Sequence, residues 1–250
     1  MKTVIALLFF AFELHSQTIY LPDPALKARL LQNSASIQAA SPNVFNTSAD
    51  LDHDGEIDIA EAQLVFGLDL SHNGGPAIHS LEGLQHFVNL RVLICNGNAL
   101  WSTAGIPQQV QVLEISGNNI SEFNAQEFPQ LQKLDCSSNP ISTIDVDELW
   151  HLKEFKIRNT QVSELDCRMT GVVKLDCGDN PNLAYINIQN GQLWKSRKSS
   201  EFSPLQFDNL PSINQLCVDP GDAVWLPHSQ CDLSQATVFT GTNCSAGNSR

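Results

Sequence analysis

Apolar residues recur through the middle of the chain with a regular spacing. Five segments share the pattern L-x-x-L-x-L-x-x-N, and they begin at Leu90, Val110, Leu131, Leu152 and Val172. Their central anchors are Leu93, Leu113, Leu134, Phe155 and Leu175, which follow one another at intervals of 20 or 21 residues. Alternation of apolar and polar residues is typical of a strand that buries one face. The repeat therefore predicts short strands that stack into a parallel sheet along a solenoid.

A second alternating segment follows each of the later strands. These segments begin at Ile120, Ile141, Val162 and Leu183. Because the period leaves little room for a helix, we expect the opposite side of the solenoid to be extended as well. Four of the five strands are followed by an asparagine that can satisfy backbone groups in the turn, at Asn98, Asn118, Asn139 and Asn180. Thr160 takes this place in the fourth unit, which predicts a weaker ladder there.

Six of the seven cysteines fall into two groups. Cys95, Cys136 and Cys177 occupy apolar positions of the repeat and are two repeats apart. Their backbones are then roughly 10 Å apart, beyond the roughly 7 Å over which a disulfide forms, so we expect free core cysteines. Cys217, Cys231 and Cys244 lie in the tail, where a bridge is plausible. We favour Cys217 with Cys244, which leaves Cys231 unassigned.

The repeat pattern is interrupted after Ile188. Residues 189–206 are polar and basic, and we interpret them as an insertion into the last turn. The spacing returns in Leu210, Ile213, Leu216 and Val218, which matches that of Phe128, Leu131, Leu134 and Cys136. The expected division is a signal peptide over 1–17, an N-terminal cap over 18–67, a solenoid over 68–218, and a C-terminal cap and tail over 219–250.

The N-terminus has the pattern of a secretory signal peptide. Lys2 precedes an apolar run from Val4 to Phe12, and small or polar residues follow near Ser16 and Gln17. This run is too short to span a bilayer, and no later segment is apolar enough to do so. We expect export to the cell surface or the medium; the alternative is a buried N-terminal element.

An acidic stretch, DLDHDGEIDIAE, runs from Asp50 to Glu61 and has the spacing of an EF-hand calcium loop. The loop positions 1, 3, 5, 7, 9 and 12 are taken by Asp50, Asp52, Asp54, Glu56, Asp58 and Glu61, and Gly55 is at position 6. Alternating carboxylates can surround a hard cation that takes six to eight oxygen ligands, and Glu56 would contribute its main-chain carbonyl. The stretch therefore predicts a calcium site. The alternative is a solvated turn that caps a helix.

Two helices are expected around this stretch. Asp23 caps the first, in which Pro24 takes the first turn. Asp58 and Glu61 form a capping box at the start of the second. Residues 37–49 contain Pro42 and turn formers instead of an entering helix, and there is one such loop. Because calcium sensors use paired loops, we expect this calcium to be structural.

Taken together, these motifs resemble exported bacterial leucine-rich-repeat proteins of the internalin-like type. The resemblance is carried by LEGLQHFVNLRVLICNGN from Leu81, LQKLDCSSNPISTIDV from Leu131 and YLPDPALKARLL from Tyr20. It implies an α/β leucine-rich-repeat solenoid of short, mostly extended repeats with a small helical N-terminal cap and a C-terminal cap. It also implies a surface or secreted binding protein. Many of these proteins carry a C-terminal secretion or anchoring domain, which we do not expect in this sequence.

Charge and motif content narrow the functional classes. The formal net charge of −13 opposes nucleic-acid binding. The seven histidines lack metalloprotease spacing, and no serine elbow or phosphate loop occurs, so we expect no enzyme. The remaining classes are an adhesion or protein-binding module, and a scaffold or targeting part of a larger extracellular assembly.

Two surfaces are candidates for a protein or glycan partner. One is the outward sheet face, with Glu114, Asp135, Lys156, Arg158 and Asp176. The other is the insertion, in which Trp194 lies beside Lys195, Arg197 and Lys198. The alternatives are a merely solvated sheet and a disordered loop.

Overall fold

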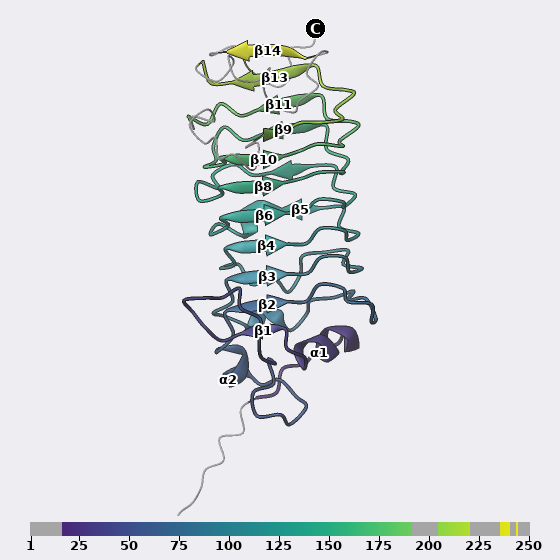
Figure 1. Ribbon diagram of the computed structural model, residues 1–250, viewed down its shortest axis with the longest axis vertical. Helices are drawn as coiled ribbons and strands as arrows, with labels where there is room; N and C mark the ends of the chain where they lie inside the picture. The colour runs from purple at the N-terminus through teal and green to yellow at the C-terminus, as the bar shows by residue number, and fades with distance from the viewer. Residues whose placement is uncertain (1–16, 192–204, 221–235, 241–243, 245–250) are drawn as a thin grey trace, which may run out of the picture.

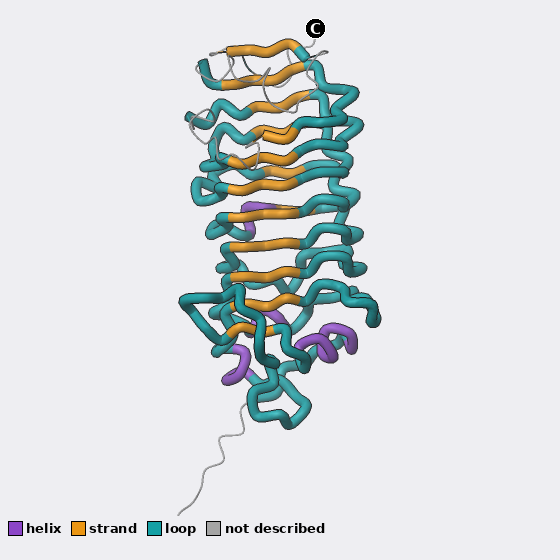
Figure 2. The backbone as a smooth tube through the Cα atoms, in the orientation of Figure 1, coloured by secondary structure: helices purple, strands orange, loops and turns teal. Residues whose placement is uncertain are grey.

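The chain forms an elongated solenoid in which strands stack one above another along the long axis (Figure 1). The computed structural model describes residues 17–191, 205–220, 236–240 and 244. Two short α-helices lie at the N-terminal end, and loops make up most of the remaining chain (Figure 2). The signal-peptide region up to residue 16 lies outside the described residues.

An eight-stranded sheet forms one side of the solenoid. Its order is β1-β2-β3-β4-β6-β8-β10-β12, and all neighbours are parallel except β1 and β2. The strands are β1 (Ala35–Ser36), β2 (Gly67–Asp69), β3 (Val92–Ile94), β4 (Val112–Glu114), β6 (Lys133–Asp135), β8 (Glu154–Lys156), β10 (Lys174–Asp176) and β12 (Leu205–Gln206). The five predicted anchors are in register and buried, which confirms the predicted parallel sheet.

The opposite side is also extended. A four-stranded sheet has the order β14-β13-β11-β9, and β5 pairs with β7. These strands are β5 (Phe123–Asn124), β7 (Ile144–Asp145), β9 (Glu164–Asp166), β11 (Tyr185–Asn187), β13 (Gln215–Val218) and β14 (Thr237–Thr240). Two short 3-10 helices are also present, η1 (Leu84–His86) and η2 (Ala125–Glu127), and η2 directly follows β5. The prediction of an extended second side is thus confirmed.

The register assigned to the last repeat from sequence was wrong. Leu205 pairs with Leu175 in the main sheet, so residues 205 and 206 form β12 and are not part of an insertion. Leu216 instead pairs with Ile186 in the opposite sheet. The reason is that Ile213, Leu216 and Val218 follow one another at intervals of three and two residues, and the strands on both sides of the solenoid have this spacing. Leu131, Leu134 and Cys136 show it on one side, and Leu183, Ile186 and Ile188 show it on the other.

The predicted asparagine ladder is present in the turns that leave the main sheet. Asn139 is representative: its Nδ2 donates to the carbonyl oxygens of Ile115 and Cys136, at 2.9 and 3.0 Å, and its Oδ1 accepts from Ile120 N. Thr160 has a single hydroxyl proton in the same place, and its Oγ1 lies 2.8 Å from Asn180 Oδ1. The ladder is therefore less complete at this turn.

The cysteine groups behave differently. Cys95, Cys136 and Cys177 are buried thiols outside any disulfide, as their place in the repeat predicts. Cys217 and Cys244 form a disulfide with a Cα–Cα distance of 5.8 Å. This disulfide and the pairing of β14 with β13 hold the C-terminal end of the solenoid. Cys231 lies outside the described residues.

The N-terminal cap contains both predicted helices. α1 (Pro24–Leu30) begins after Asp23, whose Oδ1 accepts from the amides of Ala25 and Leu26. α2 (Ile59–Ala62) begins with the capping box of Asp58 and Glu61. The other oxygen of Asp23 accepts from His79 and Ser80, so α1 is fixed to the first repeats.

Candidate functional site

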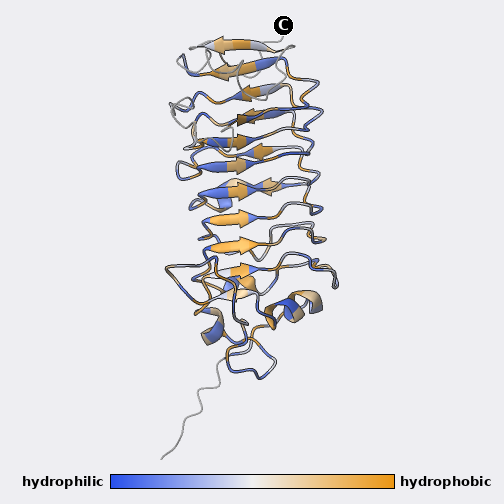
Figure 3. Cartoon of the chain, in the orientation of Figure 1, coloured by the Kyte–Doolittle hydropathy of each residue, from blue (hydrophilic) through white to orange (hydrophobic). Residues whose placement is uncertain are grey.

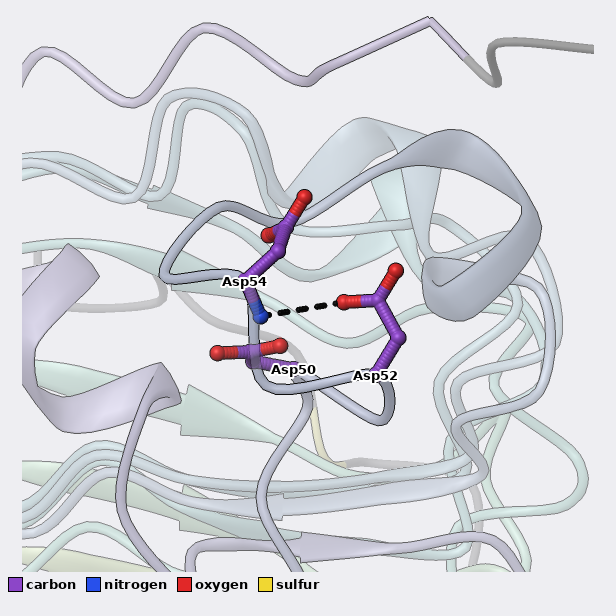
Figure 4. A group of neighbouring side chains, drawn as sticks. All are labelled: Asp50, Asp52 and Asp54. Atoms are coloured by element: carbon purple, nitrogen blue, oxygen red, sulfur yellow. Dashed lines mark hydrogen bonds between the residues drawn. The ribbon is translucent and has the colours of Figure 1, made fainter. Parts of the chain in front are cut away.

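Three carboxylates of the acidic loop lie together at the N-terminal end. One oxygen each of Asp50, Asp52 and Asp54 is within 4.8 Å of the other two, and Figure 4 shows the three side chains around one turn of the loop. Two oxygens bound to one Ca²⁺ at 2.3–2.6 Å are separated by at most about 5 Å. The triad therefore has a spacing that one calcium ion can bridge.

Backbone conformation brings this triad together. His53 and Gly55 have φ values of 64° and 86°, so the chain turns sharply between the carboxylates. The amide of Gly55 donates to Asp50 Oδ2 at 3.1 Å, and the amide of Asp54 donates to Asp52 Oδ1 at 3.1 Å (Figure 4). These bonds orient the carboxylates within the loop.

Asp50 provides the test of whether the loop fits a cation. Its side chain is 5% exposed, and Oδ1 is the one buried side-chain oxygen or nitrogen without a hydrogen-bond partner among the described residues. A buried anionic oxygen without a donor is costly. A bound cation would supply the missing partner, so the residues fit a calcium ion.

The other predicted ligands have different roles in the structure. Glu61 lies outside the triad: its Oε1 accepts from Leu51 N at 2.6 Å, and its Oε2 accepts from Asp58 N at 2.9 Å. The side chain of Glu56 forms an ion pair with Lys27 of α1 at 2.6 Å. This agrees with the expectation that Glu56 would bind an ion through its main-chain carbonyl and not through its side chain. Glu61 thus closes the loop, and Glu56 ties it to α1.

The main sheet presents a second candidate site, its outward face. One outward row contains Val92, Val112, Lys133, Glu154 and Lys174, and the parallel row contains Ile94, Glu114, Asp135, Lys156 and Asp176. Both outward positions on β3 and the first one on β4, Val112, are apolar, and these two strands are mostly orange in Figure 3. Charged residues occupy the second position on β4, Glu114, and both positions on β6, β8 and β10. We call these two rows together with Arg158 the sheet face.

Charges on the sheet face pair across neighbouring strands. Lys133 contacts Glu114 at 2.6 Å, Lys174 contacts Glu154 at 2.9 Å, and Lys156 lies 3.5 Å from Asp135. Burial alone would raise the pKa of Glu154, but the hydrogen bond from Lys174 and the nearby lysines lower it below its usual range. The face is consequently held in one arrangement and has little unbalanced charge.

Arg158 is the centre of a wider network. It forms hydrogen bonds with Asp176 and Asp179, at the end of β10 and in the turn after it, and with Asp208, which follows β12 in the next turn of the solenoid. The bond from Arg158 lowers the pKa of Asp208. A Cβ on Gly178 would lie 2.4 Å from Arg158 Nη1, so the guanidinium packs directly on the backbone there. Sequence reasoning missed both Asp179 and Asp208. The insertion hid the alignment of Asp208 with Arg158, whereas Asp179 lies one repeat period after Arg158 and could have been found from that spacing.

The structure brings Glu114, Asp135, Lys156, Arg158 and Asp176 onto one surface. Trp194 and its basic neighbours lie outside the described residues. Within the described ranges, no helix combines the length and the apolar composition needed to cross a membrane.

Comparison with known proteins supports the repeat architecture. The Leucine Rich Repeat family matches residues 130–152, which include β6. Among solved structures, the chain is similar to an internalin (InlF) from Listeria monocytogenes, with 13% identity, coverage of 88% of this chain and 91% of that chain, and a TM-score of 0.40. It is also similar to internalin C2 from the same species, with 17% identity, coverage of 88% and 94%, and a TM-score of 0.41. No curated protein matches the sequence. The strand register and the repeat match define the fold as a leucine-rich-repeat solenoid.

Proposed function

We propose that this chain is an exported protein-binding module that uses the sheet face to contact its partner. The observation that carries the proposal is the composition of that face. It combines an apolar area, with the half-buried Ile94 and Val112, and an area of paired charges. Interfaces between proteins commonly combine an apolar centre with a polar rim.

Charge balance supports a protein partner. The sheet face has four acids, Glu114, Asp135, Glu154 and Asp176, and four bases, Lys133, Lys156, Arg158 and Lys174. These charges cancel, although the whole chain has a formal net charge of −13. A neutral or acidic protein therefore meets less repulsion at this face than at the average surface of the molecule.

Export is supported by two independent features. The apolar run at the N-terminus has the pattern of a signal peptide. Disulfides such as Cys217–Cys244 persist in oxidising compartments and are rare in the cytosol.

The test is partner capture from envelope or host-cell extracts with the full chain as bait. A double variant, Ile94→Gln with Lys156→Gln, alters both areas of the sheet face. Lys153→Gln is the matched control, because Lys153 is exposed and lies three residues before Lys156. We expect capture by wild type and control, and a loss in affinity of about tenfold or more for the double variant, equivalent to about 1.4 kcal/mol. Equal capture by all three proteins would remove the sheet face as the site.

A scaffold role is the second candidate, and the same experiment separates it. A scaffold would co-purify with its assembly but show no affinity for isolated partners.

We propose further that the acidic loop binds a structural calcium ion. Asp50, Asp52 and Asp54 would supply carboxylate oxygens, and Glu56 would supply its main-chain carbonyl. The unpartnered Oδ1 of the buried Asp50 supports this assignment. Calcium would reduce the repulsion among these carboxylates and thereby stabilise the N-terminal cap, which contains β1 of the main sheet.

A further inference from the structure

The first described residues lie against the acidic loop. Thr18 and Asp58 form an antiparallel bridge. On one side of it Ile19 N donates to Ile57 O at 2.7 Å, and on the other Ile59 N donates to Gln17 O at 3.1 Å. We call residues 17–19 the N-terminal strap. It covers the half of the loop that follows the carboxylate triad.

We propose that the N-terminal strap is part of the cation site, so that calcium binding and docking of the strap stabilise each other. This inference rests on the proposed calcium site, and it identifies docking of the strap as the event that regulates calcium affinity. The strap fixes the peptide groups around Ile57, which follow directly after the Glu56 carbonyl that is expected to ligate the ion. A strap that is docked therefore preorganises a ligand that the triad does not contain.

Burial shows that the docked strap is anchored. Ile19 is 4% exposed and Ile57 is fully buried, and both belong to the main hydrophobic core. The next residues of the chain reach the first repeats: a Cβ on Gly83 would lie 2.5 Å from Leu21 Cδ2 and 3.0 Å from Tyr20 O. The contact requires glycine at position 83, which has a φ of 106°.

A continuous set of contacts thus runs from the triad to the solenoid. The loop bonds to the strap, the strap continues into Tyr20 and Leu21, and these pack on Gly83. Removal of the predicted signal peptide would act on the same element. A cut after Ser16 leaves the strap whole, whereas a cut after Gln17 removes the carbonyl that accepts from Ile59.

The hydrogen bond from Ile59 offers a precise test in the full chain. Ile59 is the first residue of α2, where proline is well tolerated, and Asp58 before it is already extended, with φ −106° and ψ 169°. Ile59→Pro therefore deletes the donor to Gln17 O while it preserves the capping box. Ile59→Ala is the control, since it shortens the same side chain and keeps the donor.

The measurement is the Kd for Ca²⁺ by titration calorimetry, together with hydrogen exchange at the Ile19 amide with and without Ca²⁺. We expect Ile59→Pro to bind Ca²⁺ at least about fivefold more weakly than Ile59→Ala, at the lower end of typical coupling between sites. We also expect Ca²⁺ to slow exchange at Ile19 in wild type. Equal Kd values for the two variants, or unchanged exchange, would overturn the role of the strap and leave the calcium site standing. Absence of Ca²⁺ binding in wild type would overturn both.

Discussion

In the turns that follow β3, β4, β6, β8, β10 and β12, one residue adopts a left-handed backbone conformation. Gly97 and Gly117 occupy this place in the first turns, and Ser138, Asn159, Asp179 and Asn209 occupy it later, with φ values from 53° to 71°. For a residue with a side chain, this left-handed conformation is unfavourable by about 1–2 kcal/mol, whereas glycine adopts it readily but loses more backbone entropy on folding.

We predict that Ser138→Gly raises the free energy of unfolding by roughly 0.5–1 kcal/mol in urea denaturation.

Gly117→Ser is the reciprocal change and should lower the free energy of unfolding by a similar amount. Its Cβ would lie 3.6 Å from Gly97 Cα, an ordinary contact, so backbone strain alone is tested. Two changes of the same sign would contradict the explanation.

Thr160 interrupts the asparagine ladder at a single residue. An asparagine there would face the amide of Ile141 as Asn98 Oδ1 faces the amide of Ile78, at 3.0 Å. Since each added hydrogen bond contributes about 0.5–1.5 kcal/mol, we predict that Thr160→Asn raises the free energy of unfolding by about 1 kcal/mol. Thr160→Val, of similar size but without the hydroxyl, should lower it. Thermal or urea unfolding of both variants checks the prediction.

At the scale of elements, one substitution in the acidic loop should change the melting temperature in opposite directions with and without calcium. Asp50→Asn removes a buried negative charge from the triad while it keeps the shape of the side chain. Without Ca²⁺ the variant should melt at the same temperature as wild type or higher, because repulsion among the carboxylates falls. With excess Ca²⁺ it should melt lower, because a ligand is lost. Melting curves in chelator and in calcium test this, and a lower melting temperature in chelator would contradict it.

The network of Arg158 joins three successive turns, and its contribution should depend on pH. The bond from Arg158 lowers the pKa of Asp208. The stabilisation is therefore present above the unfolded pKa of Asp208, about 3.9, and is lost as pH falls through the lower folded pKa. Asp208 is partly exposed, so Arg158→Met should cost only about 0.5–1 kcal/mol at neutral pH.

Urea unfolding of wild type and Arg158→Met between pH 7 and pH 2.5 measures this dependence. The difference between the two proteins should shrink at the acidic end. A difference that stays constant would assign the effect to packing of Arg158 on Gly178.

The sequence predicts the elements of this fold well where a given residue pattern occurs in only one kind of structural element. The strand anchors, the N-caps of α1 and α2, and the core cysteines outside disulfides follow from local spacing. The assignment of Leu216 to the main sheet was wrong because apolar residues have the same intervals, three and then two residues, on both sides of the solenoid. The strap could not be predicted, since Thr18 and Asp58 belong to segments with no shared pattern. The contact of Arg158 with Asp208 could not be predicted either, because the insertion hides the repeat register of Asp208.

At the scale of the whole molecule, the two ends are stabilised by different means. The acidic loop and α2 lie at one end, and β13 and β14 lie at the other (Figure 1). The disulfide between Cys217 and Cys244 holds the second end. Each repeat of a solenoid contacts only its neighbours, so a change at one end reaches the other only through the intervening strands.

We predict that changes at the two ends are additive. Replacing Cys217 and Cys244 by alanine should lower the free energy of unfolding by about 2–4 kcal/mol, the usual range for a disulfide. Combined with Asp50→Asn in excess calcium, the total loss should equal the sum of the separate losses within about 0.5 kcal/mol. Urea unfolding gives the free energies, and hydrogen exchange shows which strands open first. A coupling well above 0.5 kcal/mol would mean that the solenoid transmits the state of the calcium loop along its whole length, and calcium could then influence a partner anywhere on the sheet face.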